Sequence, residues 1–147
     1  MQIKCNINHK EYSFEAEATK RAIDIIRELG ITSVKEGCGE GECGACSIFF
    51  NGKLVNSCLL IAPQMQDAEI LTLEGLYEET QIVRENFAKN GAVQCGFCTS
   101  GFVLRAHDYI EQKGAKDEKV LKDALDGNLC RCTGYQKIVE AILKSMP

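Results

Sequence analysis

Cysteine constrains this chain more than any other residue, because nine cysteines occur in 147 residues and most of them fall in close groups. The first group, Cys38, Cys43 and Cys46, has the spacing C-x4-C-x2-C inside a glycine-rich run. That spacing is typical of plant-type [2Fe–2S] ferredoxins, and Cys58 is available as the fourth ligand. An odd number of cysteines argues against a complete set of disulfides. In a reducing compartment, such a density of thiols favours metal binding.

The segment after this group explains how Cys58 reaches it. Asn51-Gly52 is a strong signal for a two-residue hairpin turn, with strands expected at 47–50 and 53–57. In the register that this turn sets, Cys58 lies beside Cys46 at the open end of the hairpin. The glycines allow positive φ values and let backbone N–H groups point at sulfur. A zinc knuckle also uses four thiolates, although it favours paired CxxC hairpins, and it is the alternative for this site.

A second set of cysteines lies in the C-terminal half. Cys95 and Cys98 form a CxxC at the start of one predicted helix, and Cys130 and Cys132 precede another. The partial positive charge at a helix N-terminus lowers thiol pKa values and favours an anionic cluster. Alone, these cysteines would also suit a redox dithiol or half of a zinc site. Beside a complete ferredoxin motif, a second iron–sulfur cluster is the most economical interpretation, although the spacing does not fix its nuclearity.

The period of the hydrophobic pattern changes once, near residues 75–79. Upstream, alternation predicts strands and one amphipathic helix, whereas the downstream spacing is helical throughout. The predicted strands lie at 3–7, 12–16, 47–50, 53–57 and 70–73, and the predicted helices at 19–29, 78–90, 99–112, 117–126 and 135–144. Thr19 is expected to act as the N-cap of the first helix. We therefore predict an α+β chain, with a β-rich domain at 1–76 and an all-helical domain at 77–147.

Composition narrows the class of partner. Hydrophobic residues make up 45% and charged residues 26% of the chain, as is typical of a folded globular protein. The net charge is -4 with both signs interspersed, so no nucleic acid is expected as a partner and a protein fits better. The longest strongly apolar stretch, 58–62, is too short to cross a membrane, so no membrane insertion is expected. The first residues lack a secretory signal, which predicts a cytoplasmic protein.

Three other residues are not expected to take part in chemistry. Cys5 lies at an inward-facing strand position, which favours a buried structural thiol. His9 falls in a predicted turn and His107 in a predicted helix, where surface or packing roles are expected. No catalytic acid or base is assigned to this chain, because the cysteines already complete two sites.

Three motifs together resemble the iron–sulfur subunit of the molybdenum hydroxylases, the family of xanthine dehydrogenase, aldehyde oxidoreductase and nicotinate dehydrogenase. The motifs are EGCGEGECGAC at 36–46, QCGFC at 94–98 and GNLCRCTGY at 127–135, in the family's order. The resemblance implies a β-grasp ferredoxin domain followed by an all-α four-helix domain, each with one [2Fe–2S] cluster. It also implies an oxidoreductase complex in which this chain relays single electrons between molybdopterin on a large subunit and FAD on a medium subunit.

The resemblance also implies roles for individual residues. The cluster near the pterin would be held by Cys95, Cys98, Cys130 and Cys132, and the cluster nearer flavin by Cys38, Cys43, Cys46 and Cys58. Gln94 matches a residue that hydrogen-bonds the pterin cofactor, and the sulfur of Cys132 is implied to approach the pterin amino group. Ser100 departs from the family, which usually has proline there. Serine can cap the helix, so we expect a small change in local rigidity.

Three alternatives remain open on the sequence. A free-standing ferredoxin would shuttle between enzymes and would not copurify with larger chains. A structural zinc protein would be colourless. A complex of the hydroxybenzoyl-CoA reductase type would run its chemistry reductively, and no feature of this chain separates its iron–sulfur subunit from that of an oxidase-type complex. The large subunit determines the substrate.

Overall fold

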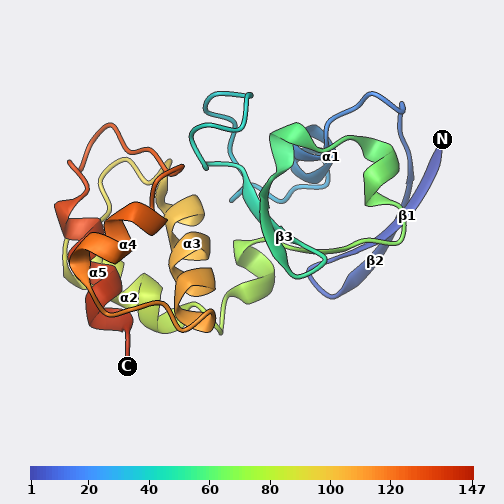
Figure 1. Ribbon diagram of the computed structural model, residues 1–147. Helices are drawn as coiled ribbons and strands as arrows, with labels where there is room; N and C mark the ends of the chain where they lie inside the picture. The colour runs from blue at the N-terminus through green and yellow to red at the C-terminus, as the bar shows by residue number, and fades with distance from the viewer.

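The computed structural model describes residues 1–147, with a sheet half and a helical half lying side by side (Figure 1). The strands are β1 (Gln2–Ile7), β2 (Lys10–Glu15), β3 (Ser47–Phe50), β4 (Lys53–Asn56) and β5 (Glu69–Leu71), in the sheet order β2-β1-β5-β3-β4. The α-helices are α1 (Ala22–Glu28), α2 (Gln81–Lys89), α3 (Thr99–Glu111), α4 (Glu118–Ala124) and α5 (Gln136–Ser145). The short 3₁₀ helices are η1 (Ser57–Leu59), η2 (Ala62–Met65) and η3 (Leu73–Leu76).

The sheet is mixed, and α1 shares its core. β1 runs antiparallel to β2 and parallel to β5, while β3 runs antiparallel to both β4 and β5. Ile3, Cys5 and Ile7 alternate along β1 and are buried, as the two-residue period of a strand requires. Ile23 and Ile26 of α1 are buried in the same core. This packing fixes the segment after α1, which leads to the first cysteine group.

The β3–β4 hairpin has the predicted turn. Asn51 and Gly52 have φ values of 49° and 80°, and two positive values in succession are the mark of a type I′ turn. At the open end of the hairpin, the Ser57 N–H donates to Cys46 O at 3.2 Å. The predicted register is therefore confirmed, and it leaves Cys58 close to Cys46.

The helical half has a separate core. Each of its helices contributes a large buried side chain: Phe87 from α2, Phe102 from α3, Leu121 from α4 and Ile138 from α5. Within α5 the buried residues Ile138, Val139, Ala141 and Ile142 recur at helical spacing, which is the pattern that distinguishes the second half of the sequence. No helix of the chain combines the length and the apolar character that crossing a membrane would require.

The mixed sheet and the helices confirm an α+β chain with a ferredoxin-like part and a helical part. Two local predictions are wrong. Thr19 does not cap α1; the N-cap position is Arg21, because the chain is held there by the Ala22 N–H, which donates to Leu60 O at 2.8 Å. The last strand ends at Leu71, because the residues beyond it turn into η3.

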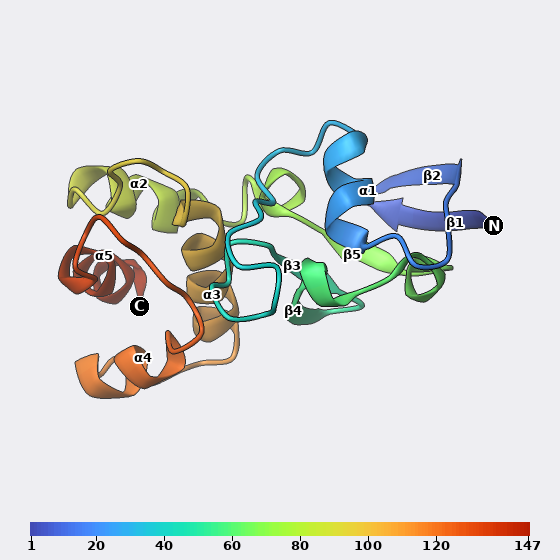
Figure 2. The same ribbon diagram turned by 90° about the horizontal axis from the view of Figure 1, so that it is seen from above.

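Helix α3 is the element that brings the helical half against the sheet half (Figure 2). It packs on β3, where the His107 ring meets the edge of the Phe49 ring at a centroid separation of 6.0 Å. Near its first turn, Gly101 lies so close to the first cysteine loop that a Cβ there would stand 3.1 Å from the Gly44 carbonyl carbon. The start of α3, and with it the CxxC, is therefore pressed against that loop.

Candidate iron–sulfur sites

The glycine-rich loop presents backbone N–H groups to one of its own sulfurs. Cys38 Sγ accepts hydrogen bonds from the N–H groups of Glu40, Glu42 and Cys43, at 3.4, 3.3 and 3.4 Å. These bonds, of which the one from Glu40 has the largest effect, lower the pKa of the Cys38 thiol to about 7. A sulfur with three donors is stabilised as a thiolate, which is the form that binds a metal.

Two glycines make this conformation possible. Gly41 has a φ of +79°, and a Cβ there would stand 2.5 Å from Leu59 Cδ1. Gly44 has a φ of +73°, and a Cβ there would stand 2.6 Å from Gly127 O and would also overlap the Asn128 side chain. A left-handed backbone and a close neighbour both exclude larger residues. At Gly44 the close neighbours belong to the helical half, just before its second pair of cysteines.

Cys46 and Cys58 join the first set from the hairpin. Both are buried, and Ser57 Oγ donates to Cys46 O at 2.8 Å, which holds η1 against the loop. Burial, together with the neighbouring Cys46 thiol, raises the pKa of Cys58 to about 11. Two adjacent buried thiols can both lose their protons only beside a positive charge, and iron bound between them would supply that charge.

The second set is built around the start of α3. Cys98 is the N-cap residue of α3, and burial, followed by contact with the Cys130 thiol, raises the pKa of Cys98 to about 12. Thr133 donates to Cys130 Sγ through its hydroxyl at 3.1 Å and its N–H at 3.4 Å. Burial alone would raise the pKa of Cys130, but these bonds outweigh burial and lower it. Thr133 is a donor to sulfur that cysteine spacing did not reveal.

Cys95 and Cys132 form the exposed edge of this set, and the contact between them raises the pKa of Cys132. The eight thiols approach one another two by two: Cys38 with Cys43, Cys46 with Cys58, Cys95 with Cys132 and Cys98 with Cys130. No set of three or more His, Cys, Asp or Glu side chains has the spacing of a single-ion site. A [2Fe–2S] cluster takes two ligands on each of its irons, so the residues present fit two such clusters.

A backbone hydrogen bond joins the two sets directly. The N–H of Leu129, which precedes Cys130, donates to Cys43 O at 2.9 Å. Phe97, between the cysteines of the CxxC, lies against Gly37, where a Cβ would stand 3.6 Å from Phe97 Cε1. The two cysteine loops therefore hold each other in place.

Comparison with known proteins identifies the family. Residues 5–72 match the 2Fe-2S iron-sulfur cluster binding domain, and residues 72–143 match the [2Fe-2S] binding domain. The nicotinate dehydrogenase small FeS subunit of Eubacterium barkeri is 44% identical over 143 residues, which cover 95% of this chain and 91% of that protein. The xanthine dehydrogenase iron-sulfur-binding subunit of Escherichia coli O157:H7 is 40% identical over 145 residues, which cover 96% and 91%. This chain belongs to the small iron–sulfur subunits of the molybdenum hydroxylases.

The fold agrees with that family. The crystal structure of quinoline 2-oxidoreductase from Pseudomonas putida 86 superposes with a TM-score of 0.88 at 35% identity, covering 99% of this chain and 93% of that chain. The prediction of an electron-transfer subunit of a molybdenum hydroxylase is confirmed, and the free-standing ferredoxin is not supported. The small subunit is a component of an oxidoreductase.

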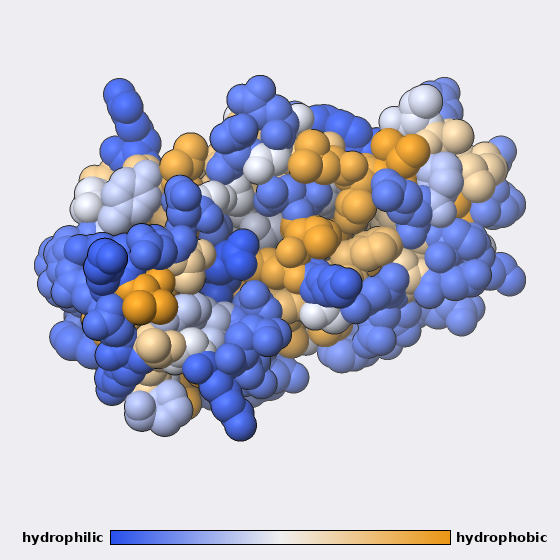
Figure 3. All heavy atoms as spheres, in the orientation of Figure 1, coloured by the Kyte–Doolittle hydropathy of each residue, from blue (hydrophilic) through white to orange (hydrophobic).

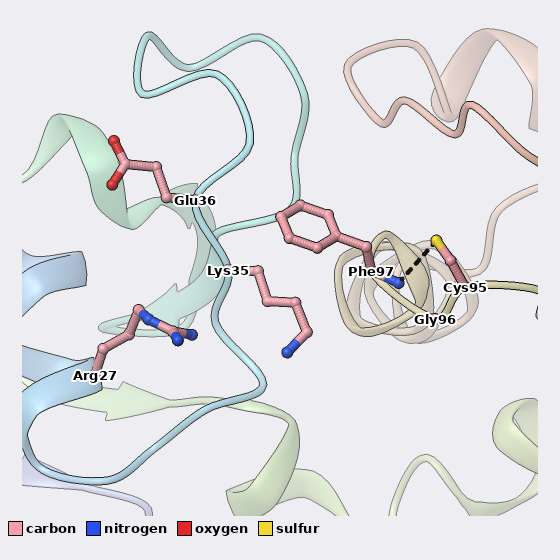
Figure 4. A pocket seen from close by; sticks show the side chains of 6 residues that line it. All are labelled: Arg27, Lys35, Glu36, Cys95, Gly96 and Phe97. Carbon is pink, nitrogen blue, oxygen red and sulfur yellow. Dashed lines mark hydrogen bonds between the residues drawn. The ribbon is translucent and has the colours of Figure 1, made fainter.

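The small subunit has a cleft of about 410 Å³ beside Cys95 (Figure 4). Its lining residues are Arg27, Lys35, Glu36, Cys95, Gly96 and Phe97. Glu36 turns away from the cleft to Arg21, whose Nη1 donates to Glu36 Oε1 at 2.7 Å and lowers the pKa of that carboxyl. Arg27 and Lys35 therefore give the cleft a net positive charge, although the whole chain is acidic.

The remaining predicted residues lie as follows. Gln94 is exposed, immediately before Cys95. Cys5 is buried in β1, and burial raises its pKa, as expected of a structural thiol. His9 contacts Gly75 O through Nε2 at 3.2 Å. His107 packs on β3 as described above, so neither histidine approaches the thiols.

Two expectations about helix starts are corrected. Ser100 does not cap α3; its Oγ donates to Ser33 O at 2.6 Å, because the first turn of α3 faces the sheet half. Cys130 and Cys132 precede α5 as predicted, but they do not lie at its N-terminus, since Tyr135 has a φ of +71° and α5 begins only after it. The second site therefore combines one helix start with a compact loop.

Proposed function

We propose that this subunit relays single electrons between molybdopterin on a large subunit and FAD on a medium subunit. The observation that carries the proposal is the direct bond between the two thiol sets, from the Leu129 N–H to Cys43 O at 2.9 Å. When bound, a [2Fe–2S] cluster takes up and gives back one electron at a time. The chain itself holds the thiolates, donates hydrogen bonds to them and keeps the two sets at a fixed separation.

In this proposal each set of four thiolates holds one [2Fe–2S] cluster. The first set is Cys38, Cys43, Cys46 and Cys58, and the second is Cys95, Cys98, Cys130 and Cys132. Hydrogen bonds to sulfur stabilise the more negative, reduced form and therefore raise a reduction potential. The three backbone donors to Cys38 act in this way in the first set, and Thr133 does so in the second.

In this proposal the large subunit docks at the second set. Cys95 and Cys132 are exposed there, with the large apolar side chains of Phe97 and Leu129 exposed beside them. Exposed apolar surface next to functional groups marks a docking site. From this face Gln94 and the Cys132 sulfur would reach the pterin.

In this proposal the medium subunit docks at the first set. Leu59, the residue after Cys58, is 60% exposed, and Ile61, two residues further along the chain, is 41% exposed. Figure 3 shows apolar side chains gathered over this part of the sheet half. Two docking faces, each next to one thiol set, suit a subunit that lies between two partners.

The two halves are proposed as two domains, a β-grasp domain at 1–76 and a four-helix domain at 77–147. Their separate hydrophobic cores support this division, because no residue is shared between the two clusters of buried side chains. In this proposal eight of the nine cysteines serve as iron ligands and none is joined in a disulfide, which suits a reducing, cytoplasmic location.

The proposed ligands are tested with Cys43→Ser in the purified complex, with Cys5→Ala as the matched control. Cys43→Ser should halve the iron content and remove one of two distinct signals from the EPR spectrum of the reduced complex. Cys5→Ala should change neither, since Cys5 is a buried residue of β1 that belongs to neither set. Two intact signals in Cys43→Ser would reject the ligand assignment, and a native complex without iron or acid-labile sulfide would reject the function.

A further inference from the structure

A chain of polar contacts crosses the junction between the two halves. It begins at Ser100 in the first turn of α3, whose side chain is buried and whose Oγ donates to Ser33 O at 2.6 Å. Ser33 lies in the segment between α1 and Cys38. The bond therefore ties the helix that follows Cys98 to the segment that leads to Cys38.

Ser33 is held in turn by Glu74 of η3. The Ser33 N–H donates to Glu74 Oε1 at 3.0 Å, and Ser33 Oγ donates to Glu74 Oε2. Thr72 Oγ1 donates to the same Oε2 at 2.5 Å. Hydrogen bonds to a carboxylate are stronger than bonds between neutral groups, so Glu74 holds Ser33, the residue whose carbonyl oxygen accepts the hydrogen bond from Ser100.

The far end of the chain of contacts is anchored in the sheet. Asn8, in the β1–β2 turn, donates from Nδ2 to Thr72 Oγ1 at 2.8 Å and accepts from the Thr72 N–H at 2.8 Å. Gly75 makes room for this pair, since a Cβ there would stand 2.8 Å from Asn8 Cγ. The contacts run without a break from Asn8 through Thr72, Glu74 and Ser33 to Ser100.

We propose that Ser100, Ser33 and Glu74 are positioning residues that hold the CxxC end of α3 at a fixed separation from the first thiol set. The inference rests on the proposed function, because the separation matters only if both sets hold clusters that exchange electrons. The part-buried Ser100–Ser33 bond has the larger effect, since Glu74 is exposed and water competes for its oxygens. None of the three residues contacts iron; they act through the backbone that carries the ligands.

The test compares Ser100→Ala with Ser145→Ala in the full-length, iron-loaded subunit. Ser145 is the matched control because its Oγ donates to Ala141 O within α5, away from the junction. In Ser100→Ala, backbone amide exchange should rise together at 30–36 and 99–104, by about 2- to 12-fold, the factor expected for loss of one hydrogen bond. Ser145→Ala should leave both segments unchanged.

A spectroscopic measurement separates positioning from stability alone. When both clusters are reduced, their spin–spin interaction depends on their separation and orientation. Ser100→Ala should change or broaden the resulting EPR splitting, while iron content and the g values of each singly reduced cluster stay the same. Unchanged splitting together with unchanged exchange would overturn the positioning role.

Glu74→Ala is the second variant, since Glu74 contacts no cysteine. It should produce both changes more weakly than Ser100→Ala. Glu74→Gln should have an effect between the wild type and Glu74→Ala, because the amide keeps one acceptor oxygen. If Ser100→Ala fails to fold, Glu74→Ala decides by the same two measurements. Backbone amide exchange does not depend on electron transfer, so the two proposals can fail separately. If amide exchange rises in these variants but the wild-type complex never relays electrons, the proposed function is rejected and the positioning role is kept.

Discussion

Replacing Gly101 with alanine tests how closely α3 is packed against the first cysteine loop. Gly101 is buried, and the neighbours that a Cβ would meet are backbone atoms of the loop rather than flexible side chains. A Cβ at this position would stand 3.1 Å from the Gly44 carbonyl carbon and 3.4 Å from Ala45 Cα, and closer still to the Gly44 oxygen. Neither side can yield without moving a ligand-bearing segment.

Two effects of opposite sign decide the result. Alanine is a better helix former than glycine by about 1 kcal/mol, which favours the variant. Overpacking a close contact costs about 1–3 kcal/mol, and the upper part of that range applies where rigid backbone lies on both sides. We therefore expect Gly101→Ala to destabilise the subunit by about 1–2 kcal/mol, which corresponds to a fall of about 2–8 °C in Tm.

Denaturant titration of the iron-loaded subunit, followed by far-UV circular dichroism, measures this change. Glu111→Ala is the control, because Glu111 is an exposed residue of the same helix and its replacement should change stability by less than about 0.5 kcal/mol. A Gly101→Ala subunit as stable as the wild type, or more stable, would show that helix propensity wins. In that case α3 is not pressed against the loop.

Three further predictions concern single side chains. In the iron-free chain at neutral pH, iodoacetamide should modify Cys38 long before Cys98. Their pKa values of about 7 and about 12 mean that a much larger fraction of Cys38 is in the reactive thiolate form. Mass spectrometry of the labelled peptides gives the order of modification. Partial desolvation of its carboxylate opposes ionisation of Glu74, but the hydrogen bonds from Ser33 and Thr72 outweigh it and lower the pKa of Glu74 below the usual 4.5. The stability that this carboxylate contributes should be fully present above about pH 4.5 and should be lost as the pH falls through the lower pKa of the folded state. The free energies of unfolding of the wild type and of Glu74→Gln should therefore become equal as the pH is lowered in a series of denaturation experiments. Asp117→Ala removes the N-cap side chain that accepts the Val120 N–H at 2.9 Å, so it should destabilise α4 by about 0.5–2 kcal/mol and speed amide exchange in that helix. Lys119→Ala, at an exposed position of the same helix, should leave amide exchange in α4 unchanged.

Local features were predictable from the sequence because nearby residues determine them. The Asn51-Gly52 turn fixes its own register, and that register brings Cys46 and Cys58 together. The spacing of hydrophobic residues likewise predicted the position of each helix in the second half. The N-cap of α1 was mispredicted because a tertiary contact, from the Ala22 N–H to Leu60 O, replaces the local signal of Thr19.

The contacts between the halves were not predictable. Ser100 and its acceptor Ser33 are separated by 67 residues, and the sequence pattern suggested a cap for Ser100 because capping is the local role of serine at a helix start. The Leu129 N–H to Cys43 O bond involves backbone atoms, which carry no sequence signal. The donor role of Thr133 depends on the shape of the loop before α5. That loop includes a positive φ at Tyr135, and because tyrosine seldom adopts this conformation, the sequence did not predict it.

The close approach of Gly44, Gly127 and Gly101 bears on how such subunits can evolve. At Gly44 and Gly101 the opposite half leaves no space for a side chain, whereas a Cβ at Gly127 would meet no atom and only its φ of +104° favours glycine. Recombination that joins the sheet half of one relative to the helical half of another will therefore yield a working hybrid only when the parents carry glycine at the positions of Gly44 and Gly101. The halves have separate cores, yet they are inherited as one piece.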